Sequence, residues 1–384
     1  MAYLLPLAQF LQQAQNTPDK VYLHQPIKRQ LQTLTWAEVD KQARSVAQTL
    51  LDQGLVAGDK VAILSKNCAQ WFICDLAIMM AGMVSVPIYH TANRKTIQFV
   101  LQHSGCKLTF VGKLDGKAEV EAGIPKDMKT IALPYDTLAT DMTWQQALEA
   151  DAIKQIHEAS RDEMQSIVYT SGSTGQPKGV VLSYGNMAAA AYHSKEHLGS
   201  YHKDHVISYL PLAHIVERSL IETASFYTGS QVFFVESLRT FVDDLKTASP
   251  DLFVSVPRMW TKFQAEVLKK MPQRKLQLLL KIPLINRLLK KKIQSNLGMQ
   301  QAREFGCGSA PISPAILHWF NSIGIGISEG WGMTETAGLG CINSPFNAKA
   351  IGTIGKPIQS LEMKISDEQE ILVKGDAVFS SYYN

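Results

Sequence analysis

The chain has 384 residues, of which 46% are apolar and 19% are charged, and its formal net charge is +4. This length exceeds one compact unit, and the composition is that of a globular protein rather than a disordered one. No run of about 18 apolar residues occurs, which argues against a membrane-spanning helix, and we expect no nucleic-acid partner.

The cysteines and the N-terminus indicate where such a chain functions. The five cysteines are scattered, odd in number and without a Cys-x-x-Cys pair, which argues for reduced thiols and against a disulfide framework or a zinc site. The first 20 residues contain no basic region followed by a small-residue cleavage site. We therefore expect a cytoplasmic protein.

The first third of the chain alternates helices with short apolar strands. Thr35 and Glu38 form a predicted capping box, and apolar residues at helical spacing follow as far as Gly54. Beyond it we predict, in turn, strand, helix, strand, helix and strand over residues 60–64, 69–81, 84–88, 94–103 and 108–111. This alternation is typical of βαβ units and a largely parallel sheet. Residues 1–160 are predicted to form the first α/β subdomain.

Residues 166–186 read SIVYTSGSTGQPKGVVLSYGN, which is two groups of β-forming residues around a polar loop. The loop at 170–179 holds three glycines, four hydroxyl side chains and Lys178. Glycines let a ligand approach backbone N–H groups, and hydroxyls and lysine suit anionic oxygens, so we predict a phosphate-binding loop. It is not a Walker A loop, because β-forming residues instead of a helix follow Lys178. By composition alone it would fit a surface loop between strands.

The α/β pattern continues after this loop. Ser183 is placed to cap a helix that begins near Tyr184, and strands are predicted near residues 207–210, 232–235 and 252–256. Residues 161–349 are therefore predicted to form a second α/β subdomain. Residues 350–384 contain short strands between Gly and Pro turns, which indicates a small β-rich section.

Residues 267–303 form an unusually basic segment. They contain ten Lys or Arg and no Asp or Glu, with leucines and isoleucines interleaved, and Pro272 and Pro283 are predicted to break the helix. The pattern fits a solvated helical hairpin whose leucines pack inward. It also fits contact with an anionic membrane surface, which would place the protein peripherally at the inner face of a membrane, or contact with a polyphosphate ligand.

Three further stretches carry candidate site residues. Residues 208–218 read SYLPLAHIVER, with His214 after an apolar strand, and residues 306–311 read GCGSAP, small residues at a predicted strand-to-helix turn. Residues 329–336 read EGWGMTET, in which Trp331 offers a flat ring and Glu335 a carboxylate. Taken singly, each stretch is compatible with a structural histidine or an ordinary turn.

Together with the loop, these stretches resemble the adenylate-forming enzymes, the superfamily of acyl-CoA synthetases, luciferases and peptide-synthetase adenylation domains. The resemblance is closest to the long-chain fatty acyl-CoA synthetases. It covers nearly all of the chain from Thr35 on, because IGKP at 354–357, LVKG at 372–375 and YYN at 382–384 also match in order. The family usually has tyrosine where Trp331 stands. The implied fold is α/β, with two doubly wound αβαβα subdomains and the start of a small β-barrel-like section.

The resemblance also implies roles for individual residues. The loop would hold the β- and γ-phosphates of ATP through Thr170, Ser171, Gly172, Ser173, Thr174, Gly175 and Lys178. The other residues implied to bind the nucleotide are Gly308, Ser309, Ala310, Pro311, Glu329, Gly330, Trp331, Gly332, Met333 and Thr334, with the small-residue turn and the Trp331 ring at the adenine. The implied catalytic residues are Lys178, His214 beside the carboxylate being activated, Thr334 at a phosphate, and Glu335 as the Mg²⁺ ligand.

The implied reaction joins a long-chain fatty acid to CoA through an acyl-AMP intermediate, with ATP and Mg²⁺ as cofactors and CoA as co-substrate. Two alternatives remain. One is a fatty acyl-AMP ligase that passes the acyl-AMP to a carrier protein, and the other is a non-catalytic module that binds a nucleotide or an acyl chain.

The resemblance further implies motifs beyond those present in the 384 residues. These are the aspartate that binds the ribose hydroxyls, the hinge, and the C-terminal lid with its catalytic lysine. We therefore expect this chain to correspond to the large N-terminal domain of such an enzyme, able to bind nucleotide but slow in turnover.

Overall fold

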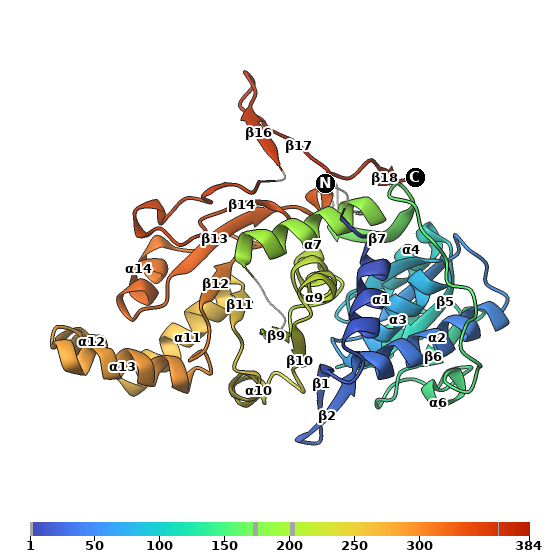
Figure 1. The fold of residues 1–384 in the computed structure, drawn as a ribbon, viewed down its shortest axis with the longest axis horizontal. Helices are drawn as coiled ribbons and strands as arrows, with labels where there is room; N and C mark the ends of the chain where they lie inside the picture. The colour runs from blue at the N-terminus through green and yellow to red at the C-terminus, as the bar shows by residue number, and fades with distance from the viewer. Residues whose placement is uncertain (1–2, 172–175, 200–203, 360) are drawn as a thin grey trace.

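The computed structural model describes residues 3–171, 176–199, 204–359 and 361–384, and these form two large β-sheets with helices packed against them (Figure 1). One sheet contains β3 (Lys60–Leu64), β4 (Val84–Ile88), β5 (Cys106–Val111), β6 (Lys129–Ala132), β7 (Met164–Ser171), β8 (Pro177–Ser183) and β18 (Tyr382–Tyr383). Their order across the sheet is β18-β8-β7-β4-β3-β5-β6. Strands β3 to β7 are parallel where they pair, whereas β8 is antiparallel to β7 and β18 is antiparallel to β8.

The second sheet contains β1 (Val21–Ile27), β2 (Gln30–Thr35), β9 (His205–Ser208), β10 (Gln231–Phe234), β11 (Leu252–Ser255), β12 (Glu304–Cys307), β13 (Ile327–Gly332), β14 (Gly340–Ile342) and β15 (Lys356–Pro357). Their order is β15-β14-β13-β12-β11-β9-β10-β1-β2. The central strands are parallel, and β2, β14 and β15 are antiparallel to their neighbours. The predicted alternation of strands and helices is thus confirmed.

The helices of the first half are α1 (Pro6–Asn16), α2 (Trp36–Asp52), α3 (Ala69–Met80), α4 (Arg94–Ser104), α5 (Ala118–Gly123), α6 (Trp144–Ala147) and α7 (Tyr184–Leu198). Those of the second half are α8 (Ile215–Glu217), the π-helix η1 (Arg218–Thr223), α9 (Ala224–Thr228), α10 (Phe241–Ala248), α11 (Pro257–Lys270), α12 (Gln273–Leu280), α13 (Pro283–Asn296) and α14 (Pro314–Ser322), with 3₁₀ turns η2 (Thr334–Thr336) and η3 (Ala348–Ala350). Among the described residues, no helix combines the length and the apolar character that crossing a membrane requires.

Helix caps form where the sequence predicts them. The Thr35 hydroxyl accepts a hydrogen bond from the Glu38 backbone at the start of α2, and the Glu38 carboxylate accepts one from the Thr35 N–H. Ser183 and Asn186 cap α7 in the same reciprocal way. Such a pair satisfies backbone donors that the first helical turn leaves free, so it sets where each helix begins.

The largest apolar core joins the two sheets. It contains side chains of β3 and β5 from one sheet and of β1 and β10 from the other, with α1, α2, α3 and α9 among them. Tyr22 stacks on Trp36, and Phe10 contacts both Trp36 and Phe226 edge-on or at a tilt. Because one core buries residues from both sheets, the sheets are expected to hold a fixed relative position.

The predicted subdomains over residues 1–160, 161–349 and 350–384 do not coincide with the sheets. Strands β1 and β2 lie in the sheet of the later strands, while β7 and β8 lie in the sheet of the earlier ones. That these three segments are separate folding units remains a prediction.

The expected start of a β-barrel-like section needs correction, since the described residues contain no closed barrel. Strands β15 and β18 are hydrogen-bonded to β14 and β8 at the edges of the two large sheets. The remaining strands, β16 (Glu362–Ile365) and β17 (Ile371–Lys374), pair only with each other and project from the molecule (Figure 1). The short strands therefore extend existing sheets or form one hairpin.

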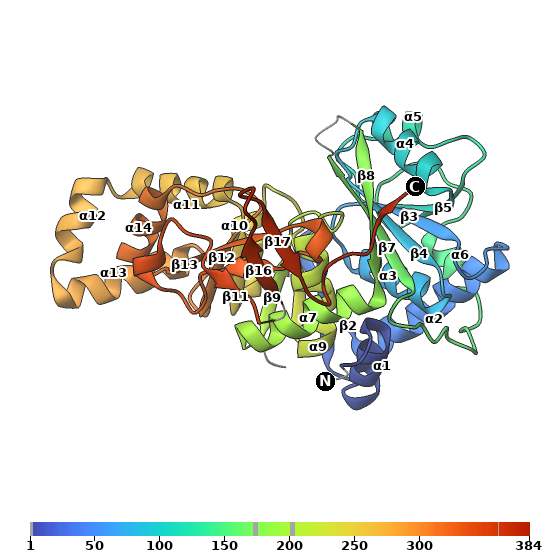
Figure 2. The same ribbon diagram turned by 90° about the horizontal axis from the view of Figure 1, so that it is seen from above.

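The basic segment forms the predicted helical hairpin. Helix α11 ends before Pro272 and α12 ends before Pro283, as expected from the missing N–H of proline. Helices α12 and α13 form an arm at one end of the molecule in both views (Figures 1 and 2). The interpretation that its leucines pack inward is only partly right, since Leu276 and Leu289 are buried but several others are exposed.

Candidate active site

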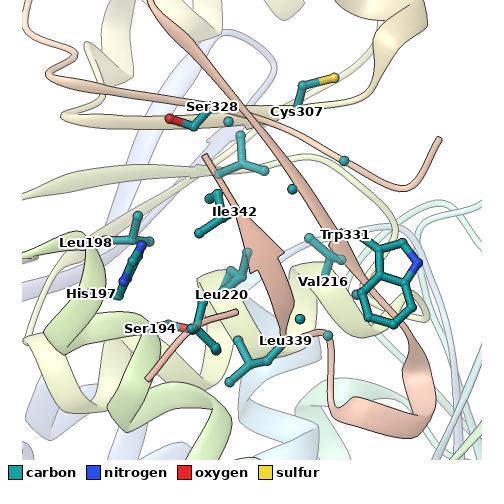
Figure 3. A pocket seen from close by; sticks show the side chains of 18 of the residues that line it. Ser194, His197, Leu198, Val216, Leu220, Cys307, Ser328, Trp331, Leu339 and Ile342 are labelled. Carbon is teal, nitrogen blue, oxygen red and sulfur yellow. The ribbon is translucent and has the colours of Figure 1, made fainter. Parts of the chain in front are cut away.

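A cavity of about 100 Å³ lies between α7 and the strands β11 to β14 (Figure 3). Most of its lining is apolar side chains or glycine. Helix α7 contributes Ser194, His197 and Leu198, and strands β12 and β13 contribute Cys307 and Ser328 from the other side. The parallel strands β11, β12 and β13 bring their carboxyl ends to one edge of the sheet, which is where ligands usually bind in such sheets.

The small-residue turn after β12 opens onto this cavity. Gly308 and Ser309 line it, whereas Ala310 and Pro311 are exposed. A Cβ atom at Gly308 would lie 3.3 Å from the Gly330 carbonyl oxygen, so the turn and β13 run close together. Ser309 has a φ of +66°, an uncommon value for a residue other than glycine, and one that marks a tightly constrained turn.

Residues 329–333 form the neighbouring wall. Gly330, Trp331 and Gly332 line the cavity, and Met333 is exposed. A Cβ at Gly332 would lie 2.4 Å from the Gly338 carbonyl oxygen, so a larger residue cannot form this tight loop. Glu329 is buried, and its Oε1 accepts a long, 3.4 Å hydrogen bond from the Ile312 N–H, which connects it to the end of the small-residue turn.

Lys178 and Glu335 meet at the ring of Tyr382. The Tyr382 hydroxyl donates to Glu335 Oε1 at 2.8 Å, and Lys178 Nζ lies 5.3 Å from the centre of the same ring. The backbone carbonyl of Glu335 accepts from the Phe379 N–H at 2.8 Å, which fixes the turn that carries the carboxylate. Thr334 begins the same 3₁₀ turn and is half-buried.

The structure describes only the two ends of the predicted phosphate loop. Thr170 pairs with Lys178 and Ser171 with Pro177 across the antiparallel ladder of β7 and β8. Four of the predicted site residues, Gly172, Ser173, Thr174 and Gly175, lie outside the described residues.

His214 lies at the start of α8, next to the cavity. Its Nδ1 accepts a hydrogen bond from the Val216 N–H at 3.2 Å, and Val216 itself lines the cavity. Burial lowers the pKa of His214, so the ring is neutral near pH 7. Because Nδ1 accepts, the proton of the neutral ring lies on Nε2.

A buried polar network connects the His214 turn to β9 and to the loop after β3. Glu217 Oε1 accepts hydrogen bonds from Asn67 Nδ2, Ser208 Oγ and the Tyr209 N–H at 3.1, 2.7 and 2.8 Å. Burial raises the pKa of Glu217 to about 8, and the hydrogen bonds from Ser208 and Tyr209 oppose that rise.

Arg218, the next residue, connects the same turn to α3 and β7. Its guanidinium donates to both carboxylate oxygens of Asp75 at 2.8 and 2.7 Å and to Ser166 Oγ of β7 at 2.5 Å. The next residue, Ser219, donates to the Ala337 carbonyl at 2.7 Å, just after the Thr334 turn. The His214 turn is thereby connected both to the strand that precedes the phosphate loop and to the turn that carries Glu335.

The predicted site residues thus fall into two groups. Gly308, Ser309, Gly330, Trp331 and Gly332 surround the mouth of the cavity, and Lys178 and Glu335 flank Tyr382. An apolar cluster from β7, β8, α8 and the loop after η2 packs between the elements that carry them. The structure therefore places these seven residues around one region rather than at separate surfaces.

Sequence reasoning did not single out several residues at this site. Tyr382 belongs to a string that matched the family, but nothing in its neighbours indicates a contact with Glu335. Ser194 and His197 lie on a helix whose cavity-facing side has no recognisable motif. Asn67 lies three residues after the end of β3, and its position beyond the carboxyl end of a parallel strand is the one signal that could have found it.

This chain is similar in sequence to known proteins of one enzyme family. A family model described as "AMP-binding enzyme" matches residues 10–383. The long-chain-fatty-acid–CoA ligase FadD15 of Mycobacterium bovis is 29% identical over 415 residues, covering 98% of this chain and 68% of that ligase. The peroxisomal long chain acyl-CoA synthetase 7 of Arabidopsis thaliana is 28% identical, covering 91% of this chain and 56% of that protein.

Solved structures share the fold over almost the whole chain. The N-terminal domain of FACL13 from Mycobacterium tuberculosis, bound to an inhibitor, has a TM-score of 0.79 at 20% identity, covering 99% of this chain and 91% of that one. The O-succinylbenzoate coenzyme A synthetase MenE of Bacillus subtilis, in complex with AMP, has a TM-score of 0.75 at 25% identity, covering 98% and 89%. These likenesses confirm the predicted α/β fold.

Proposed function

This chain belongs to the AMP-binding enzyme family, and on that basis we propose that it is an AMP-forming ligase that activates a long-chain fatty acid with ATP and transfers it to CoA. In the first step a carboxylate oxygen attacks the α-phosphorus of ATP, and the bond to pyrophosphate breaks, which yields acyl-AMP. In the second, the CoA sulfur attacks the acyl carbonyl carbon, AMP leaves, and the thiol proton is released. The names of the related ligases support both the acid and the acceptor.

The observation that carries this proposal is an apolar cavity that opens between two parts of a predicted nucleotide site. Trp331 and the small-residue turn lie at its mouth, and leucine, valine and isoleucine side chains line its interior. A ring at the mouth suits an adenine base, and an apolar interior suits an acyl chain. His214, held neutral beside Val216, can donate from Nε2 toward a carboxylate without adding a charge.

We assign charge neutralisation at the phosphates to Lys178 and to the N–H groups of residues 170–179. Attack of one anion on another is slow unless the two are positioned and their charge is balanced, which is what fixed cations and N–H groups provide. The Thr334 hydroxyl would donate a hydrogen bond to a phosphate oxygen. No general base is required in the first step, since the attacking carboxylate is already ionised.

Glu335 would hold Mg²⁺ together with the phosphates of ATP. Its donor set fits this role, because Mg²⁺ often takes only one or two protein carboxylates and completes its shell with phosphate and water. In the described part of the chain no cluster of three or more His, Cys, Asp or Glu could hold a metal without such a ligand. When bound, the ion would neutralise phosphate charge, and Tyr382 would then compete with it for Glu335 Oε1.

The proposal is tested by calorimetry with palmitoyl-sulfamoyl adenosine, a stable mimic of the acyl-AMP. We expect it to bind tighter than AMP, since the acyl part adds apolar contact in the cavity. Trp331→Ala should weaken binding roughly 5- to 100-fold, the usual loss of a base-stacking ring, while Trp331→Tyr should bind as the native chain does. Binding no tighter than that of AMP would leave a nucleotide-binding module without an acyl site.

We also propose that the arm formed by α12 and α13 contacts an anionic membrane, at the inner face where a cytoplasmic enzyme meets its acyl substrates. Large apolar side chains on this arm are exposed, namely Leu278, Ile282, Leu284, Ile285 and Leu288 at 64, 46, 82, 38 and 69%. Basic side chains of the same helices are interleaved with them. Apolar side chains among cations are the combination that favours insertion at an anionic lipid surface.

A further inference from the structure

The end of the cavity that lies farthest along β12 from the small-residue turn, called the inner end below, carries several polar side chains. Strand β12 runs from Glu304 at that end to the small-residue turn at the mouth, which at roughly 3.3 Å per residue is a depth of about 13 Å. At the inner end the lining consists of Leu252 and Glu304 from the starts of β11 and β12, and of Ser194 and His197 from the last turns of α7.

Polar atoms of this lining have no partner in the described part of the chain. They are Ser194 Oγ, His197 Nε2 and, halfway along the cavity, Ser328 Oγ. Ser194 and Ser328 are only 5% and 2% exposed, and His197 is half-buried. Figure 3 shows Ser328 on the opposite wall from the two α7 residues, so the unpaired atoms face the same space from two sides.

Glu304 adds a carboxyl group to this inner end. Burial raises the pKa of Glu304, and the neighbouring Arg303 and His197 oppose that rise. The Glu304 carboxyl group is therefore close enough to His197 to interact with it, but it makes no hydrogen bond to His197 Nε2.

Unpaired polar atoms in a buried site cost free energy until something satisfies them. A cavity that held only a saturated hydrocarbon tail would leave all three atoms unpaired when it was filled. A hydroxyl group can donate and accept at once, so it can pair with a serine hydroxyl and an imidazole nitrogen together. The lining thus suits an acyl chain that carries a hydroxyl group far from its carboxylate.

We infer that the ligase prefers hydroxylated fatty acids, and that Ser194 and His197 recognise a hydroxyl group on the distal part of the acyl chain. This inference rests on the proposed function, since it assigns the substrate class of the same cavity. It concerns the inner end of the cavity alone and leaves the nucleotide site unchanged.

The test compares matched pairs of acyl-sulfamoyl adenosines by calorimetry. One pair is dodecanoyl and ω-hydroxydodecanoyl, and the other is hexadecanoyl and ω-hydroxyhexadecanoyl, so two chain lengths are sampled. In at least one pair we expect the hydroxylated compound to bind about fivefold tighter or more, as one to two new hydrogen bonds would give. Equal or weaker binding of the hydroxylated compound in both pairs would overturn the inference, as when ordered water already satisfies these atoms.

Substitutions at Ser194 and His197 test whether these two residues cause the preference for the hydroxylated compound. Ser194→Ala and His197→Leu should each weaken binding of the hydroxylated compound more than binding of the unsubstituted one, and so reduce the ratio of the two affinities. Leu198→Ala is the matched control, because it enlarges the same wall without removing a polar atom, and it should weaken both compounds alike. A preference that survives in both polar variants would place the recognition elsewhere and overturn the assignment.

Failure of the inference can be told from failure of the proposed function. If neither member of a pair binds tighter than AMP, the cavity is not an acyl site and the proposed function fails. If both bind tighter than AMP and equally, the acyl site stands and only the hydroxyl preference is wrong.

Discussion

Lys178 and Glu335 are 157 positions apart in the chain, yet both contact Tyr382. The lysine side chain is exposed and its ammonium lies over the ring, so it is free to move onto a phosphate without breaking an ion pair in the described part of the chain. The Glu335 carboxylate keeps one oxygen on a phenol, a neutral donor that a stronger cationic partner can displace.

Lys178→Ala should weaken ATP binding by roughly 10- to 100-fold, because a hydrogen bond between charged groups contributes about 1.5–3 kcal/mol. The fold should be unaffected, since the side chain is exposed. Calorimetry with ATP and Mg²⁺ measures the affinity, and Lys41→Ala on the exposed side of α2 is the control for a general charge effect. An unchanged ATP affinity in Lys178→Ala would show that the loop does not bind the phosphates through this lysine.

Glu335→Gln should flatten the dependence of ATP affinity on Mg²⁺, because the change removes one negative charge at nearly constant shape. Tyr382→Phe is the matched comparison, since it removes the hydroxyl that contacts Oε1 and leaves the carboxylate in place. That variant should keep the Mg²⁺ dependence or steepen it. If Glu335→Gln responds to Mg²⁺ as the native chain does, the metal ligand is another residue.

Glu217 makes the stability of the fold depend on pH. Its pKa is about 8 in the folded protein, above the ordinary glutamate value of about 4.3 that applies when the chain unfolds. The contribution is therefore complete below about pH 4 and is lost as the pH rises toward 8, where the buried carboxyl group must ionise. In the native chain the free energy of unfolding should fall by up to a few kcal/mol between about pH 4 and pH 8, and Glu217→Gln should remove this fall. Denaturant unfolding at several pH values measures it, and parallel curves for both proteins would contradict it.

The arm of α12 and α13 is the element least explained by packing. Buried Leu276, Leu289 and Ile293 attach it to an apolar core that also contains Trp260 and Phe305, so its exposed leucines are not needed for its attachment. No Asp or Glu lies between residues 267 and 303, so nothing within the segment compensates its positive charge. Such an element is suited to a surface that is both apolar and anionic.

The double variant Leu284→Ser and Leu288→Ser should reduce sedimentation with phosphatidylserine vesicles, because it removes two apolar side chains from the inserted face. Leu238→Ser is the matched control, since Leu238 is 81% exposed but lies away from the arm. Lys291→Glu with Lys292→Glu should lower binding further, by about fivefold per residue at low salt, which is the usual effect of one basic side chain. Equal binding of the native chain to phosphatidylserine and phosphatidylcholine vesicles would contradict the membrane proposal.

Over the whole molecule, the candidate site lies where elements of both sheets meet. The apolar cluster next to it takes residues from β7 and β8 of one sheet and from the loop after η2 near the other. The Arg218 network joins the same parts through polar contacts. The candidate site is thus a property of the assembled fold, and no single segment forms it.

The 384 residues assayed by themselves should bind nucleotide but catalyse palmitate-dependent ATP–pyrophosphate exchange slowly. They span 68% of FadD15, and further preorganised groups in a longer enzyme would each contribute about 10²–10³ in rate. The comparison is the same chain extended by a C-terminal domain of the related ligase, which should exchange faster. CoA thioester formation by the extended protein separates a CoA ligase from an acyl-AMP ligase. Equal exchange rates would show that residues 1–384 already hold the catalytic groups.

The sequence by itself determined many of the helices and strands and pointed to most of the candidate residues. Local interactions set helix starts at Thr35 and Ser183, and proline ends α11 and α12, so these features depend only on neighbouring residues. The glycine and hydroxyl loop and the turn around Trp331 were likewise found as strings, because their chemistry is concentrated in a few consecutive positions.

Only the tertiary structure decided which strands share a sheet, and it placed Tyr382 between Lys178 and Glu335. It also left Leu284 exposed and gathered Ser194, His197 and Ser328 around one cavity. The physical reason is that such contacts join residues far apart in the chain, and their formation depends on how whole sheets and helices pack. Hydrophobic periodicity tells which residues avoid water, but it does not tell which buried surface each of them meets.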